Sequence, residues 1–363
     1  MRKFYLKVLL MALIVYIPVV TLNYIIDPAG LYNSKIRENA VAALNMGNII
    51  ESPGDMDEGE FQKEMISSTS HKIDTVILGS SHVMYIPLKD DNCYFAGVSG
   101  AYLGDYYGVI GLLDYYNIKP KKIIIGVDPW AFMSSYDKGR HTAMQNYAVY
   151  EHNLLFDDTK KEEKKEKTDF EKLEELFSFA YFQSSVKNLK HKGIVYYLNG
   201  SAQEVNIVND DKPAEKAKIL PNARRIMEAK GYKTVDENNL NAQKAIDANH
   251  IYQLGNGIKE INKNNFDDFE KLLVYMIDNN IEVELYLPSW YPKIYEYFED
   301  TGSYVGVFEL ETMIRDIGRK YNIKVRGSYD PSLCNVKEED FADWLHLKPE
   351  KMLDNYNVVL KLE

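Results

Sequence analysis

Two stretches far apart in the sequence carry side chains that could act together as a nucleophile and its base. Ser80 and Ser81 come after Gly79, which ends residues 75–78, a largely apolar run that predicts a short buried strand. Asp343 and His346 lie three positions apart in "DWLH", so in a helical turn they share one face. There the carboxylate can accept a hydrogen bond from the imidazole Nδ1–H and leave Nε2 free as a base. These are the residue types of a serine nucleophile with a His-Asp base.

Each signal also has an ordinary explanation. Gly-x-Ser after a strand can be a turn that caps the next helix, and an isolated Asp-x-x-His is commonly an incidental surface pair. The two motifs together favour a shared site, because the loops at the C-terminal ends of parallel strands lie along one rim of a sheet. A serine after the first strand and a histidine after the last strand can therefore meet.

The elements that would position these residues follow the rhythm of a doubly wound α/β domain. We expect strands at residues 75–78, 94–98, 122–127, 281–288 and 323–327. The stretch between the second and third strands has helical spacing and ends at Pro120, as a βαβ crossover should. Two further amphipathic helices precede the fourth and fifth strands.

Residues 131–250 interrupt this pattern and are expected to form an insertion, which could lie over the site as a lid. The insertion contains the charge run "DDTKKEEKKEKTDFEKLEE". It predicts a solvated helix with one apolar stripe, formed by Phe170, Leu173, Phe177 and Tyr181. Asn199 begins a glycosylation sequon in form, and we interpret "LNGS" as a turn.

The N-terminus predicts a membrane anchor. Arg2, Lys3 and Lys7 accompany an apolar run that extends to Ile26 without a small-x-small cleavage site. The run is long enough to span the hydrocarbon core, and the positive-inside rule places the N-terminus in the cytoplasm and the remainder outside. A buried core helix of a cytoplasmic α/β protein is the alternative. We expect an anchor at 1–26, a polar, irregular juxtamembrane arm at 27–70 and an α/β domain at 71–363.

Composition excludes several classes of protein. The 363 residues carry a net charge of −11, so nucleic-acid binding is not expected. Without residues 1–22, 40 basic against 54 acidic residues give −14. Cys93 and Cys334 are too few for a disulfide scaffold or a cysteine-built zinc site, and we expect two free thiols, with one bridge as the alternative. We see no metal signature and expect no cofactor.

The motifs resemble those of the SGNH (GDSL-like) hydrolases, over about 70–130 and 265–355 together with the anchor and "NYIIDP". The closest branch is membrane-anchored and extracytoplasmic, and includes DltD-like and alginate O-acetyltransferase-like proteins. "VILGSSH" places Ser81 at the nucleophile position and Ser80 at the Asp of the motif. "AGVSGAYLGDYY" places Gly100 at the glycine whose N–H joins the Ser81 N–H in the oxyanion hole, and "DWLH" makes Asp343 the orienting residue and His346 the base. The resemblance implies a flavodoxin-like three-layer α/β/α sandwich with a mostly parallel sheet.

The third block departs from the family. The family often has Gly-x-Asn-Asp, in which the Asn side chain donates to the oxyanion, whereas this chain has "IIIGVDPW". Asp128 cannot donate as a carboxylate, so a backbone N–H, the Trp130 indole or nothing would replace the donor. Each oxyanion donor is worth about two to three orders of magnitude in rate. This departure favours a weak hydrolase or a specialised transferase. We interpret His82 as a packing or loop residue, with a second base as the alternative.

The resemblance implies a membrane-bound serine acyl-enzyme, either an esterase or an O-acyltransferase. Its substrate would be acyl esters of a cell-envelope polysaccharide or teichoic-type polymer, and its partner a membrane-bound O-acyltransferase. The acidic chain disfavours a long polyanion unless a local basic patch binds it, for which the candidates are Arg140, Arg224, Arg225 and Arg326. The alternative reading of these arginines is ordinary surface or ion-pair residues. The rival function is a non-catalytic SGNH-shaped scaffold that presents the acceptor polymer.

Overall fold

The computed structural model describes most of the chain. The described residues are 2–28, 30–32, 34–46, 48, 50–51, 57–69, 72–86, 92–133, 144–156, 169–201, 204–205, 207, 217–218, 225–227 and 232–360. The expectations for Arg140, Arg224 and most of the charge run concern residues outside these ranges.

The chain has an α/β fold built on a five-stranded parallel sheet. The strands are β2 (Thr75–Leu78), β3 (Cys93–Phe95), β4 (Lys122–Gly126), β7 (Glu282–Leu287) and β8 (Lys324–Gly327), in the order β3-β2-β4-β7-β8. All four strand pairs are parallel. The apolar runs form these strands because their side chains are buried on both faces, as in a parallel sheet covered by helices. The five predicted strands are confirmed, although the second ends at Phe95, earlier than expected.

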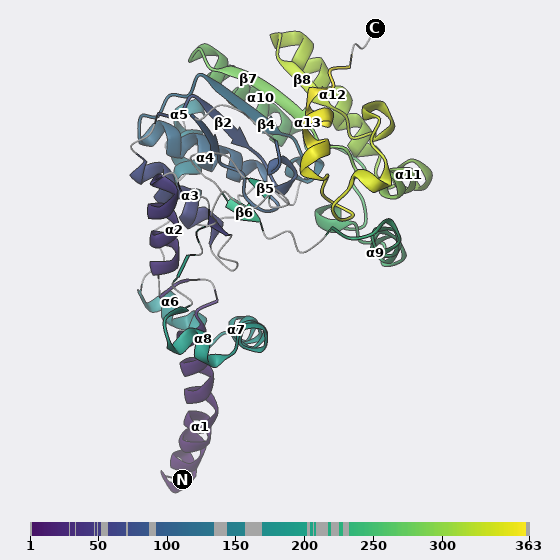
Figure 1. Cartoon of the computed structure of the whole chain (residues 1–363). Coiled ribbons are helices and arrows are strands. Elements are labelled where there is room, and N and C mark those ends of the chain that lie inside the picture. Colours follow the sequence, from purple (N-terminus) through teal and green to yellow (C-terminus); the bar gives the residue numbers. More distant parts are fainter. Residues whose placement is uncertain are drawn as a thin grey trace.

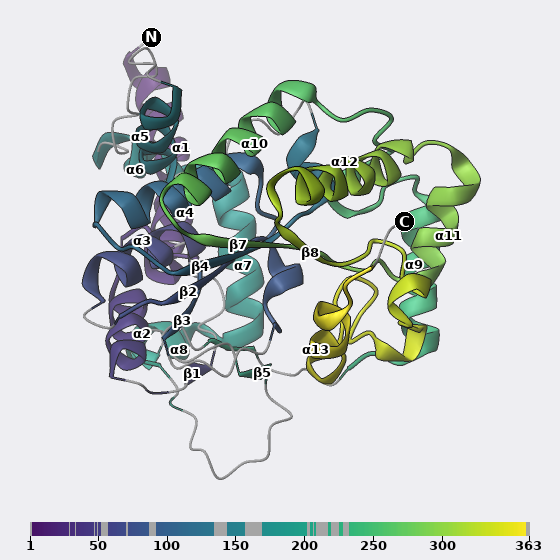
Figure 2. The ribbon, with the colours of Figure 1, turned by 90° about the horizontal axis from the view of Figure 1, so that it is seen from above.

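Helices connect successive strands. α4 (Leu103–Tyr115) leads from β3 to β4, α10 (Lys263–Asp278) precedes β7, and α11 (Pro292–Thr301) and α12 (Val305–Tyr321) connect β7 to β8. α13 (Pro349–Asn357) follows the last strand and packs against β8. Figure 2 shows α10 and α12 on one side of the sheet and α13 on the other. The chain therefore passes over one side of the sheet on its way to β7 and β8, and ends on the other.

The segment at 27–70 is not the irregular arm that its polar composition predicted. It contains α2 (Lys35–Asn45) and α3 (Glu58–Ser68), which pack against each other. Asp57 caps α3 by accepting a hydrogen bond from the Glu60 N–H at 2.9 Å. Phe61 and Met65 are one helical turn apart and bury their side chains in the common core. Turn-forming residues around the helices concealed this short apolar periodicity.

The insertion consists of separate short elements. α5 (Gln145–Phe156) packs on α4, where a Cβ on Gly111 would lie 2.1 Å from the Tyr147 carbonyl oxygen. α6 (Asp169–Leu176), α7 (Phe179–Lys192) and α8 (Ile194–Leu198) follow, and α9 (Val235–Asp247) lies beside α11. β1 (Ile50–Glu51), β6 (Arg225–Met227) and β5 (Ala217–Lys218) form a small second sheet. Asn199 ends α8, and its Oδ1 accepts from the Ser201 N–H in the expected turn.

The prediction of one helix with a single apolar stripe in the insertion was wrong. The chain breaks between α6 and α7, where Ser178 caps α7 through the Tyr181 N–H. Only Tyr181 of the described stripe residues is buried, whereas Leu173 and Phe177 are exposed. The side chain of Phe170 lies outside the described residues.

α1 (Arg2–Ile26) projects from the α/β body (Figure 1). The most apolar 18-residue window within Lys3–Ile26 has a mean hydropathy of 2.3, and the helix is long and apolar enough to cross a membrane. Only 12% of the apolar window is buried against the rest of the chain, so α1 is not a core helix. Cys93 and Cys334 are both buried free thiols, as predicted.

Candidate active site

The serine pair lies where the sheet offers a crevice. β2 is flanked by β3 and β4, and the chain runs from β2 to β3 in one direction and from β4 to β7 in the other. Open α/β sheets bind ligands at such a reversal, outside the C-terminal ends of the strands. Ser81 follows β2 and Asp128 follows β4, so both residues lie at this point.

The end of β2 turns sharply into a single 3₁₀ turn, Ser81–Val83. Gly79 has a φ of +150°, and an added Cβ would lie 3.2 Å from the Gly126 carbonyl oxygen and 3.1 Å from Val83. Ser80 is buried, and its Oγ accepts a hydrogen bond from the His82 N–H at 3.1 Å. The first serine therefore caps the turn, and the second, Ser81, is partly exposed.

Ser81, His346 and Asp343 form one hydrogen-bonded chain. Ser81 Oγ lies 2.9 Å from His346 Nε2, although the two residues are 265 positions apart. His346 Nδ1 lies 3.0 Å from both Asp343 carboxylate oxygens. With the proton on Nδ1 donated to Asp343, Nε2 can accept the Ser81 hydroxyl proton. The arrangement has the geometry of a nucleophile, its base and the carboxylate that orients the base.

The prediction that Asp343 and His346 lie in a helical turn was wrong, although the predicted contact between their side chains is present. Residues 341–347 form a loop in which Asp343 Oδ1 accepts the backbone N–H groups of Leu345 and His346, each at 2.8 Å. Ala342 N–H donates to the His346 carbonyl at 2.8 Å and closes the loop. Burial raises the pKa of Asp343, but the hydrogen bonds and charge of His346 and the two backbone N–H groups outweigh it and lower the pKa to about 2.

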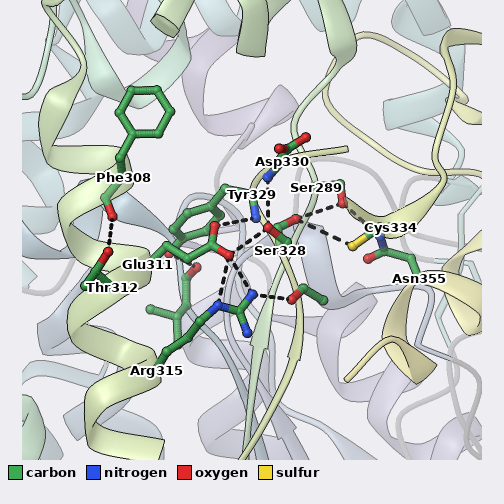
Figure 3. A network of polar contacts seen from close by, with 12 residues as sticks. Ser289, Phe308, Glu311, Thr312, Arg315, Ser328, Tyr329, Asp330, Cys334 and Asn355 are labelled. Carbon is green, nitrogen blue, oxygen red and sulfur yellow. Dashed lines mark hydrogen bonds and ion pairs between the residues drawn. The ribbon is translucent and has the colours of Figure 1, made fainter. Parts of the chain in front are cut away.

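A polar network supports the end of β8, where the segment that leads to the histidine loop begins (Figure 3). Glu311 on α12 accepts from Ser328 Oγ at 2.7 Å and from the Tyr329 N–H at 3.0 Å, and it pairs with Arg315. Arg315 Nη2 also donates to the Gly327 carbonyl at 2.8 Å. These contacts restrain the main chain at 327–329, either directly or through the pairing of Glu311 with Arg315. The network therefore fixes the position of the chain where it leaves β8.

The same segment is tied to the middle of the sheet. Tyr329 OH donates to the Val127 carbonyl at 2.8 Å, directly before Asp128. Ser289 Oγ donates to the Ser328 carbonyl at 2.8 Å and accepts from Asn355 Nδ2 at 2.8 Å. The ends of β4, β7 and β8 therefore form one connected rim, which holds the two halves of the site in register.

Asp128 forms a second His-Asp pair behind the first. Its Oδ1 lies 2.7 Å from His82 Nδ1, its carboxyl group is fully buried, and its Oδ2 has no hydrogen-bond partner among the described residues. The His82 ring centroid lies 5.7 Å from that of His346, in an edge-to-face contact, and 5.4 Å from that of Trp130. Asp128 is thus no oxyanion group, and His82 is a packing residue in an ionisable pair that the sequence interpretation missed.

The Trp130 indole is also excluded as the replacement donor. It is fully buried, and its Nε1–H donates to the Ala101 carbonyl at 2.9 Å. The contact ties the third block to the loop after β3, which contains Gly100 at a φ of +60°. The backbone N–H groups of Ser81 and Gly100 donate to no other residue in the described part of the chain. Neither N–H group is therefore used by another contact in that part of the chain.

Of the four arginines considered for a basic patch, Arg326 is the one whose side chain the structure describes. Arg326 is paired with the buried Glu284 and packs over the Tyr356 ring at 4.5 Å, so it is an ion-pair residue. Arg140 and Arg224 lie outside the described residues, as does the side chain of Arg225. Within the described ranges, no group of three His, Cys, Asp or Glu residues could hold a metal ion.

The sequence does contain a signal that could have indicated the His82–Asp128 pair. His82 is adjacent to Ser81, and Asp128 follows the strand next to β2, so both had to lie on one rim.

No protein-family model matches the chain, and no curated protein sequence matches it significantly. The assignment of chemistry therefore depends on the residues and geometry described above.

Proposed function

We propose that this protein is a membrane-anchored, extracytoplasmic serine acyl-enzyme, an esterase or O-acyltransferase that acts on acyl esters of a cell-envelope polymer. The observation that carries the proposal is the chain of contacts from Ser81 Oγ to His346 Nε2 and from His346 Nδ1 to Asp343. A surface pair of incidental residues would have no reason to point a free imidazole nitrogen at a serine at the reversal point of the sheet.

In the first half-reaction, His346 Nε2 takes the Ser81 hydroxyl proton while Oγ attacks the ester carbonyl carbon. The carbonyl oxygen becomes an oxyanion that accepts hydrogen bonds from the Ser81 and Gly100 N–H groups. Collapse of this intermediate breaks the bond to the alcohol oxygen, and His346 returns its proton to that oxygen. The products are an acyl-serine and a free alcohol.

In the second half-reaction, an incoming hydroxyl loses its proton to His346 and attacks the acyl-serine. Water gives the carboxylic acid, and a sugar or polyol hydroxyl gives a new ester. Both outcomes restore Ser81 and neutral His346. Neither Asp128 nor Trp130 supplies a side-chain oxyanion donor, because both are engaged in other contacts, and this favours a slow, specialised transferase over a fast general esterase.

The fold supports the same assignment. The strand order β3-β2-β4-β7-β8 corresponds to the flavodoxin-like order 2-1-3-4-5. This order and the helices on both sides of the sheet support the proposal that the body is a three-layer SGNH-like sandwich. α1 would be the single membrane span, with its basic N-terminus in the cytoplasm and the body outside.

The second candidate function is a scaffold of the same shape that binds acceptor polymer for a membrane-bound O-acyltransferase. The observation in its favour is the loss of side-chain oxyanion donors at Asp128 and Trp130. The two functions make opposite predictions about covalent reactivity at Ser81, because a scaffold needs no nucleophile.

The experiment is hydrolysis of p-nitrophenyl acetate by the full chain in detergent, with Ser81→Ala and His346→Ala. Ser332→Ala and His250→Ala are matched controls, since both residues are exposed. We expect turnover that disappears in the first two variants and persists in the controls. Labelling by a fluorophosphonate should likewise require Ser81.

Folded protein that neither turns over nor is labelled would contradict the acyl-enzyme and favour the scaffold. A glycoside added as acceptor would separate the two acyl-enzyme reactions. A transferase would release p-nitrophenol faster and form the acylated glycoside, and an esterase would form acetate alone.

A further inference from the structure

The three helices α6, α7 and α8, which we call the collar, surround one end of α1. Figure 1 shows them grouped at the end of α1 that joins the α/β body, and all three contact α1. The rest of α1 extends beyond them, and the side chains of Phe4 and Ile14 are examples of its exposed surface. The collar therefore lies between the proposed membrane span and the body.

Buried polar contacts hold the collar on α1. Asn23 is fully buried; its Nδ2 donates to the Leu176 carbonyl and its Oδ1 accepts from Ser185 Oγ, both at 2.8 Å. Tyr181 OH donates to Asp27 Oδ1 at 2.6 Å. Polar groups inside an apolar segment are costly unless they are paired, and here the partners come from the collar. These contacts fix its height along α1.

The part of α1 that the collar contacts lies within the stretch that would be needed to cross a bilayer. A hydrocarbon core of about 30 Å requires about 20 helical residues, which counted from Phe4 end at Asn23. The link between α6 and α7 already contacts α1 at Tyr16, whose ring centroid lies 6.0 Å from that of Phe177. Phe4 to Val15 alone would span only about 18 Å at 1.5 Å per residue. A span that begins later, after Lys7, would place the collar deeper still.

The outer surface of the collar has the composition of a membrane interface. Large apolar side chains are exposed, notably Phe179 (71%), Val195 (67%) and Leu198 (65%). Exposed lysines follow on α7 at Lys187, Lys190 and Lys192. Aromatic and aliphatic groups with nearby lysines are typical of helices that lie in the headgroup region of a bilayer. In water, such a set of exposed apolar groups would be unfavourable.

We infer that the collar inserts its apolar face into the outer leaflet of the lipid bilayer around α1. The occupant is lipid because the exposed groups surround the span itself and continue its apolar surface. The collar then fixes the distance of the α/β body from the membrane surface. This inference rests on the proposed membrane span of α1 and does not depend on chemistry at Ser81.

The test uses the full chain with Cys93→Ser and Cys334→Ser, in phosphatidylcholine–phosphatidylglycerol vesicles that contain no other protein. Single cysteines at Phe179 or Val195 carry an environment-sensitive NBD label, and doxyl lipids in the bilayer quench it. Leu10→Cys on α1 is the control for membrane insertion. Leu240→Cys on α9 is the matched control for exposure, because Leu240 is 56% exposed on the body.

We expect blue-shifted emission and several-fold stronger quenching at positions 179 and 195 than at position 240. Quenching at Leu10→Cys without quenching at 179 and 195 would overturn the collar and retain the anchor. Absence of quenching at Leu10→Cys would overturn both. Equal quenching at 240, 179 and 195 would also overturn the collar, since the body would then contact lipid without selectivity. Ser81→Ala should leave every quenching value unchanged, which separates this test from that of the acyl-enzyme.

Discussion

The buried His82–Asp128 pair predicts a non-additive effect on stability. The perturbation is His82→Gln, which removes the imidazole at 2.7 Å from a fully buried carboxylate. Asp128 Oδ2 has no hydrogen-bond partner among the described residues, so no second group is available to take over. Removing the partner of a buried carboxylate leaves that carboxylate uncompensated, at a cost of about 3–5 kcal/mol.

The size of the effect on the melting temperature follows from the length of the chain. At about 2.1 cal/mol/K per residue, 363 residues give an unfolding entropy of about 0.76 kcal/mol/K. The melting temperature should therefore fall by about 4–7 °C in His82→Gln. Asp128→Asn removes the charge and should cost only about 1–2 kcal/mol, because a neutral amide can still hydrogen-bond to the imidazole.

The assay is thermal unfolding of the full chain in detergent at pH 7, followed by circular dichroism. In the double variant, two amides replace the pair, and the loss should be smaller than the sum of the single losses by about 2 kcal/mol or more. His250→Gln, at an exposed turn, is the control and should change little. Losses that add to within about 0.5 kcal/mol, or an unchanged melting temperature in His82→Gln, would refute the reasoning.

Three further predictions concern single carboxylates. Asp343→Asn should lower esterase turnover by about three to four orders of magnitude while the fold persists, because an amide holds His346 in the wrong tautomer; turnover within tenfold of the original would contradict this. Burial opposes ionisation of Glu284, but hydrogen bonds from Arg326, Lys122 and Tyr356 outweigh it and lower its pKa to about 2. This stabilisation is present above pH 4.5 and is lost as the pH falls toward 2, so Glu284→Gln should cost about 3 kcal/mol at pH 7 and little at pH 2, as urea unfolding can measure. Burial and the Asp114 charge raise the pKa of Glu151 to about 9, so the original chain loses stability as the pH rises from 4.5 to 9. Glu151→Gln should therefore raise the melting temperature more at pH 8 than at pH 5. An equal rise in the melting temperature at both pH values would contradict this prediction.

The strands and the separated halves of the site were predictable because each depends on local pattern. Residues 75–78 form β2 as expected, since a threonine and three consecutive apolar residues before a glycine have few alternatives inside an α/β sheet. The rule that the C-terminal ends of parallel strands share one rim then brings Ser81 to His346, although the two residues are 265 positions apart. The pattern did not reveal the backbone of the histidine loop, because i,i+3 spacing fits an Asx-type turn as well as a helix.

Tertiary features were not predictable in the same way. The His82–Asp128 pair arises from the lateral order of β2 and β4, and a single sequence does not state which strands are neighbours. The helices at 35–68 were hidden because their short apolar faces are stabilised by the body against which they pack. The break at Ser178 turned a continuous stripe into two helices, because capping competes with helix continuation at serine.

The distance along the chain between Ser81 and His346 also determines when the site can exist. A ribosome that adds about 5–20 residues per second needs about 13–53 s to proceed from one residue to the other. During that time the serine has emerged without its base, and β8, which leads to the histidine loop, has not been made. Nucleophile activation is therefore delayed until the histidine loop has been made. A chain truncated before α13 could contain every residue of the serine turn and still lack the rim that α13 completes.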